Sequence, residues 1–65
     1  MYSAERQQEI LKLIEEYSRV SVAELAARFD VSESSIRRDL NELHRLGMVQ
    51  RTYGGALGYV NASSE

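Results

Sequence analysis

The chain has 65 residues, of which 43% are hydrophobic and 28% charged, with a net charge of −2 and neither cysteine nor proline. A chain this short forms at most one domain with one small core, and without cysteine it has neither a disulfide nor a thiolate metal site. No apolar run reaches ten residues and no signal-peptide pattern opens the chain, so we expect a cytoplasmic binding module without metal, cofactor or membrane contact, and not an enzyme.

The first predicted helix covers about residues 4–18, with Ser3 as its expected N-cap. Four apolar residues follow the spacing of one helical stripe and are expected in the core: Ile10, Leu13, Ile14 and Tyr17. Residues 19–21 come next. They are long enough for a β-bridge but not for a sheet.

A capping box of Ser21 and Glu24 predicts a second helix that begins near Val22. It is expected to end near Asp30, because a short polar side chain tolerates the left-handed backbone of a tight turn. The apolar stripe of this helix consists of Val22, Leu25, Ala26 and Phe29. Only a short turn then separates it from the next helix.

The third predicted helix covers about residues 33–46, opens at the N-cap Ser32 and ends at Gly47. Its inward residues are Ile36, Leu40 and Leu43. His44 lies in the last turn, where a basic side chain is favourable beside the negative end of the helix dipole. We therefore interpret His44 as structural, and not as a metal ligand or catalytic group.

Two extended runs, residues 48–53 and 56–60, follow this helix and are joined by Gly54 and Gly55, which can both take the positive φ of a hairpin turn. Three helices followed by a hairpin are typical of a winged helix-turn-helix, a mainly α fold with a small β-hairpin as its wing. We expect residues 1–60 to form this domain. Residues 61–65 are small and polar, and are expected to begin a linker to an effector domain outside this chain.

The outer face of the third helix carries side chains that suit DNA. At about 100° per residue, the residues opposite the apolar stripe are Ser34, Arg38, Asn41 and Arg45. Arginine can bind guanine and asparagine can bind adenine in the major groove, and serine and arginine can hold phosphates. Arg37, on the flank, either reaches a phosphate or pairs with Glu33. An exposed helix face is also polar simply because it meets water.

Asp39 and two wing residues have alternative interpretations. By angle, Asp39 points away from the outer face, and we expect it to pair internally with a basic group or a wing amide, the alternative being a solvated surface charge. Arg51 is either a phosphate contact or an edge charge, and Tyr53 either stacks on a sugar or covers the core. Residues 31–60 carry four arginines against three acids, whereas residues 1–30 have a net charge of −2, so the local charge favours nucleic acid where the net charge does not.

Two motifs make residues 5–58 resemble the N-terminal domain of DeoR-type bacterial transcription regulators: SIRRDL at residues 35–40 and R-x-x-G-G-A at residues 51–56. The resemblance implies binding to double-stranded operator DNA, usually to repress sugar or nucleoside catabolic genes. It also implies a full-length homo-oligomer with a second domain that senses a phosphorylated sugar. Asp30, Ser35 and Tyr53 depart from the glycine, threonine and histidine that the family commonly has at these positions.

The candidate DNA-binding residues are Ser32, Ser34, Ser35, Arg37, Arg38, Asn41, Arg45, Arg51, Tyr53, Gly54 and Gly55. The main alternative is a winged-helix module that docks onto another protein, since the same fold serves both purposes. Such a module would not need a third helix rich in arginine and asparagine. An enzyme is the least supported class, because no set of nucleophile, base and orienting group can be assembled.

Overall fold

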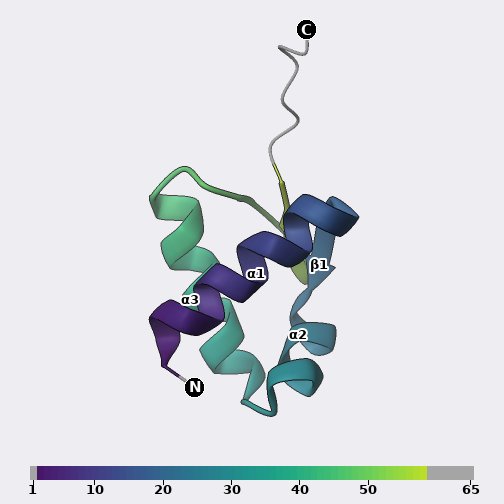
Figure 1. Cartoon of the computed structure of the whole chain (residues 1–65), viewed down its shortest axis with the longest axis vertical. Helices are drawn as coiled ribbons and strands as arrows, with labels where there is room; N and C mark the ends of the chain where they lie inside the picture. The colour runs from purple at the N-terminus through teal and green to yellow at the C-terminus, as the bar shows by residue number, and fades with distance from the viewer. Residues whose placement is uncertain (1, 59–65) are drawn as a thin grey trace, which may run out of the picture.

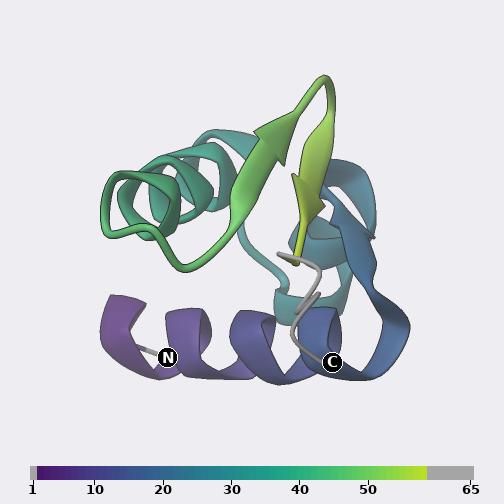
Figure 2. The same cartoon turned by 90° about the horizontal axis from the view of Figure 1, so that it is seen from above.

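The computed structural model describes residues 2–58. Its elements follow the order α1 (Ser3–Tyr17), β1 (Arg19–Ser21), α2 (Val22–Phe29), α3 (Glu33–Arg45), β2 (Gln50–Thr52) and β3 (Gly55–Leu57). Helix α1 crosses one side of the molecule, and the tip of the β2–β3 hairpin lies on the opposite side (Figure 1, Figure 2). This arrangement is the predicted winged helix-turn-helix. The last two residues of the second extended run and the expected linker, residues 59–65, lie outside the described residues.

The strands form one antiparallel three-stranded sheet in the order β1-β3-β2. Val20 of β1 lies opposite Ala56 of β3. The prediction of a bridge without a sheet at residues 19–21 was therefore wrong. These three residues gain their pairing from β3, which lies far along the chain, and no local pattern marks that contact.

The hairpin turn lies one residue earlier than predicted. Thr52 pairs with Gly55, so Tyr53 and Gly54 form the turn, and of these two only Gly54 has a positive φ, +80°. Gly55 lies inside β3, where an added Cβ would come 2.1 Å from the carbonyl oxygen of Val20. Position 55 must therefore be glycine because β1 approaches it closely, and not because of the turn geometry.

Helix ends follow the predicted chemistry with one exception. Ser21 accepts a hydrogen bond from the amide of Glu24 at 3.0 Å, and α2 ends at Asp30, which has the left-handed φ of 56°. The exception is Ser3, which is the first residue of α1 and not its cap. The N-cap is Tyr2, and the amide of Tyr2 donates to Glu5 Oε1 at 3.2 Å.

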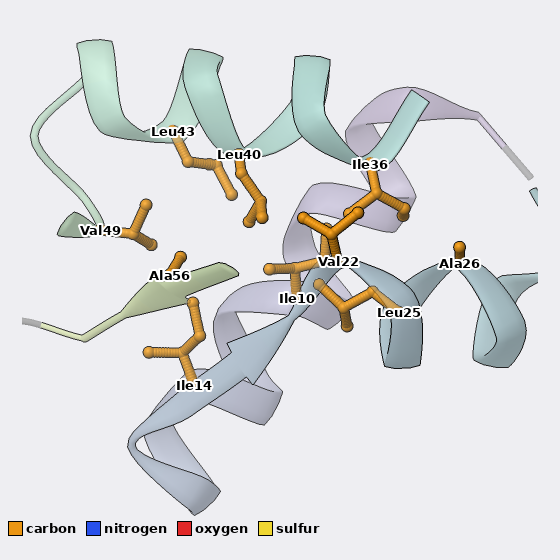
Figure 3. Close-up of a cluster of buried hydrophobic side chains, with 10 residues drawn as sticks. All are labelled: Ile10, Ile14, Val22, Leu25, Ala26, Ile36, Leu40, Leu43, Val49 and Ala56. Carbon is orange, nitrogen blue, oxygen red and sulfur yellow. The ribbon is translucent and has the colours of Figure 1, made fainter. Parts of the chain in front are cut away.

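One apolar core joins the three helices to the sheet (Figure 3). Its buried members are Ile10, Ile14, Val22, Leu25, Ala26, Ile36, Leu40, Leu43, Val49 and Ala56. The predicted inward residues Leu13 and Phe29 are half-buried against this core. Tyr17 was expected in the core but is 63% exposed, because it is the last residue of α1 and lines an open depression beside α2.

Candidate nucleic-acid interface

The apolar stripe of α3 sets the direction of its polar face. Ile36 and Leu40 have no exposed surface, which fixes the inner side of the helix. Four of the predicted contact residues are exposed on its outer side and line one shallow depression there: Ser34, Arg38, Asn41 and Arg45. Arg37 and Glu42 complete the lining. The structure thus brings together the row that the helical spacing predicts.

Two arginines of this face are held by acids of the same helix. Arg37 lies 3.3 Å from Glu33, and Arg45 donates through Nε to Glu42 at 3.2 Å. The hydrogen bond from Arg45 lowers the pKa of Glu42, and the same contact raises the pKa of Arg45. These exposed pairs are weak, so a phosphate can compete for either guanidinium.

Arg38 differs from its neighbours. Within residues 2–58 no hydrogen bond or ion pair joins its guanidinium to another side chain. All of its donors therefore stay available to a base edge or a phosphate.

Arg51 links the wing to α3. Its Nε donates to Asn41 Oδ1 at 2.9 Å, and its Nη1 donates to the carbonyl oxygen of Gly55. These bonds connect a side chain expected to read a base with one expected to hold phosphate. A guanidinium in this position orients the Asn41 amide before any DNA arrives. His44, one turn along α3, lies with its Nδ1 3.2 Å from the carbonyl oxygen of Val49, in agreement with a structural role.

The two serines at the start of α3 belong to its cap. Ser32 accepts from the amide of Ser35 at 3.2 Å, and their hydroxyl oxygens lie 3.1 Å apart. The cap confirms the predicted start of the helix. Both hydroxyls remain close to the N-terminal end of the outer face, where DNA phosphates commonly meet helix N-termini.

The wing tip presents one aromatic side chain to solvent. Tyr53 is fully exposed, so the alternative that it covers the core was wrong. The carbonyl oxygen of Gly54 accepts from the amide of Val22 at 2.8 Å, which ties the turn to the start of α2. Gly55, also a candidate contact, is buried in β3.

Asp39 pairs internally, as expected, and its partner is Arg6 of α1. Both side chains are buried. Sequence reasoning did not select Arg6, because no spacing rule connects residues that lie so far apart in the chain.

The described residues offer neither a metal-binding cluster nor a membrane-spanning helix. Residues 2–58 hold no group of three or more histidine, aspartate or glutamate side chains placed to bind a metal ion. None of the helices in this range has the length and apolar character that crossing a bilayer requires.

Similar proteins share this domain. The family model of the DeoR-like helix-turn-helix domain matches residues 6–60. The glycerol-3-phosphate regulon repressor of Haemophilus influenzae is 49% identical over 51 residues, covering 78% of this chain and 20% of that protein. The L-fucose operon activator of the same organism is 44% identical over 52 residues, covering 80% and 21%. A putative galactitol utilization operon repressor of Escherichia coli is 42% identical over 65 residues, covering 100% and 58%.

No solved structure matches the chain significantly. The chain spans a fifth to a quarter of the length of most of the curated relatives it matches. The match to the family model nevertheless covers most of the chain, and the relatives that share it carry names of transcription regulators. With the winged fold and the polar outer face of α3, this shows that the chain belongs to the DeoR family as its DNA-binding helix-turn-helix domain.

Proposed function

We propose that this chain binds one half-site of double-stranded operator DNA, with residues 33–46 in the major groove and the wing, residues 48–60, on the phosphate backbone or in the minor groove. The observation that carries the proposal is the exposed row of donors on α3, beside a wing whose Arg51 is hydrogen-bonded to Asn41. Arg38 and Asn41 are assigned to base edges. Arg37, Arg45 and Arg51 are assigned to phosphates.

The remaining candidates have positioning or backbone roles. Ser32, Ser34 and Ser35 lie at the start of α3, where hydroxyls and amides suit a phosphate. Tyr53, exposed at the wing tip, is assigned to a sugar or the backbone, and the adjoining Gly54 lets the wing approach closely. Gly55 contributes by holding β3 against β1.

The parent protein is proposed to repress genes of carbohydrate or nucleoside catabolism in the cytoplasm and to have no enzymatic activity in this domain. The names of the glycerol-3-phosphate regulon repressor and the putative galactitol utilization operon repressor support repression, although one relative is named an activator. The small share of most relatives that this chain covers supports a longer parent protein. We propose that the parent is a homo-oligomer with an effector domain that follows a linker from residue 61. A single module binds weakly, whereas a linked pair gains about 10²–10⁴-fold through effective concentration.

Binding to duplex DNA is expected to depend strongly on salt. Three or four arginines that neutralise phosphates release the counterions of the DNA, so the log-log slope of affinity against salt should be roughly −3 to −4 per chain. Fluorescence anisotropy with a labelled duplex, titrated between about 50 and 200 mM salt, measures this slope. A flat response, or no binding at low salt, would favour the protein-docking alternative.

Arg38→Ala is expected to lower operator affinity by about 1–3 kcal/mol and affinity for random DNA much less, because the lost contact reads a base. Arg28→Ala is the matched control. Arg28 is an exposed arginine of α2, in a depression that it shares with Leu13 and Tyr17 of α1, away from the outer face of α3. The Arg28→Ala variant loses one positive charge, as Arg38→Ala does, but leaves the proposed reading face unchanged. Equal losses on both DNAs for Arg38→Ala would show that the reading face is wrongly assigned.

A further inference from the structure

A polar cluster around the buried ion pair of Arg6 and Asp39 joins the N-terminal end of α1 to the middle of α3. Arg6 Nε donates to Asp39 Oδ2, and Ser3 Oγ donates to Asp39 Oδ1 at 3.0 Å. Gln7 Nε2 lies 3.4 Å from the same Oδ1, and Arg6 Nη2 lies 3.3 Å from Ser3 Oγ. Asp39 is only 2% exposed. One carboxylate of α3 is therefore surrounded by three polar side chains, all from α1.

Stability alone is a poor explanation for this cluster. Taking two charges out of water costs several kcal/mol per ion, and replacing a buried ion pair by apolar side chains is often neutral or stabilising. An ion pair with several hydrogen bonds adds a fixed orientation of one helix relative to the other, because hydrogen bonds form only in a narrow range of angles. Apolar contacts such as those of Ile36 and Leu40 are non-directional, and crossing angles of packed helix pairs scatter by about 15–20° around their preferred values, so apolar packing alone does not specify one helix orientation.

Because of the position of Asp39, the orientation of α3 matters for contacts with DNA. It directly follows Arg38 and lies two residues before Asn41, and these two side chains belong to the outer face. A rotation of α3 by about 20° moves a side-chain tip at a radius of about 6 Å by about 2 Å. Hydrogen bonds to a base edge need donor–acceptor distances of about 2.7–3.2 Å. A change of helix orientation no larger than the scatter of packing angles is thus large enough to break the readout.

We infer that Arg6 is a positioning residue for DNA readout: through its buried contact with Asp39, it holds the rotation of α3 at which Arg38 and Asn41 reach the bases. Arg6 itself needs no DNA contact. The inference rests on the proposed function, because it concerns the accuracy of the same reading face. It assigns operator discrimination partly to α1, which lies outside the helix-turn-helix formed by α2 and α3 (Figure 2).

The test replaces the ion pair by apolar side chains of similar size, in the double variant Arg6→Met with Asp39→Leu. The DNA probe is a duplex that the unchanged chain selects from a randomised pool, compared with a random duplex, at a temperature where circular dichroism shows both proteins folded. The double variant keeps the net charge, so affinity for random DNA should stay within about twofold. The operator-to-random ratio should fall about tenfold, the discrimination that one good base contact supplies.

A second ion pair of α1 provides the matched control. Lys12 lies 3.8 Å from Glu9, and both side chains are largely exposed. The double variant Glu9→Leu with Lys12→Met likewise removes one positive and one negative charge, here both from α1, and its operator-to-random ratio should not change. A folded Arg6→Met, Asp39→Leu variant that keeps the full ratio would overturn the positioning role.

The conservative variant Arg6→Lys covers the case in which the double variant does not fold. Lysine keeps the charge beside Asp39, but a compact ammonium lacks the planar fork that reaches both Asp39 and Ser3. We expect a folded protein whose operator-to-random ratio is severalfold lower, and an unchanged ratio would contradict the inference. If the unchanged chain selects no sequence from the pool, the proposed function itself fails, which is a separate outcome.

Discussion

Arg6→Met is expected to lower the free energy of unfolding by about 3–5 kcal/mol, because it leaves the Asp39 carboxylate buried without its cation. Ser3 and Gln7 can still donate to that carboxylate, but neither carries a charge. A domain of this size has little stability to spare, so the variant should be largely unfolded near 37 °C. Urea denaturation followed by circular dichroism measures the change.

The single change Asp39→Leu should cost less than Arg6→Met. The side chain of Arg6 is 11% exposed and that of Asp39 only 2%, so an unpaired arginine can extend its guanidinium toward water. The double variant of Arg6→Met with Asp39→Leu should recover most of the loss. If Arg6→Met lowered the free energy of unfolding by less than about 1 kcal/mol, the loss would match that of an exposed ion pair and would contradict the burial of this contact.

Gly55→Ala is expected to destabilise the domain by about 3 kcal/mol, at the upper end of overpacking changes. The new Cβ would lie 2.1 Å from the carbonyl oxygen of Val20 and 3.1 Å from the Cα of Ser21, both backbone atoms that cannot swing aside. β1 must therefore separate from β3, which breaks the central contact of the sheet. Thermal and urea unfolding of the variant measure the loss.

Gly54→Ala is the matched control for Gly55→Ala. The space around Gly54 is open, but its φ of +80° strains any residue with a Cβ, so we expect a cost of about 1–2 kcal/mol. Gly54→Asn should cost less than Gly54→Ala, because asparagine tolerates the left-handed region. Similar costs of about 1–2 kcal/mol for Gly54→Ala and Gly55→Ala would instead indicate the turn that the sequence alone predicts, in which both glycines have a positive φ.

Local features of the sequence determined most of the fold and the polar outer face of α3. Ser21 and Ser32 cap helices through residues three positions away, and Asp30 ends α2 in a left-handed turn. These interactions span less than one turn of helix, so spacing is sufficient to predict them. The outer row that includes Arg38 and Asn41 follows in the same way, because burying one stripe of a helix fixes what the opposite stripe presents.

The tertiary structure decided the features that depend on contacts between distant segments. Residues 19–21 become a strand only because β3 packs beside them, and the same packing moves the hairpin turn to Tyr53 and Gly54. Tyr17 has the right helical spacing for the core but is 63% exposed, because the neighbouring segments cover only part of it. Spacing describes which face a side chain occupies, and only packing determines whether that face is covered.

The buried contact of Asp39 combines the two kinds of information. Its angle on α3 predicted that it faces inward and finds an internal partner, but the identity of that partner required the structure. Arg6 lies 33 residues earlier in the chain and meets Asp39 only because α1 crosses α3 at that point. A helix carries the periodicity that orients its own side chains, whereas the crossing of two helices is set by the packing of the whole core.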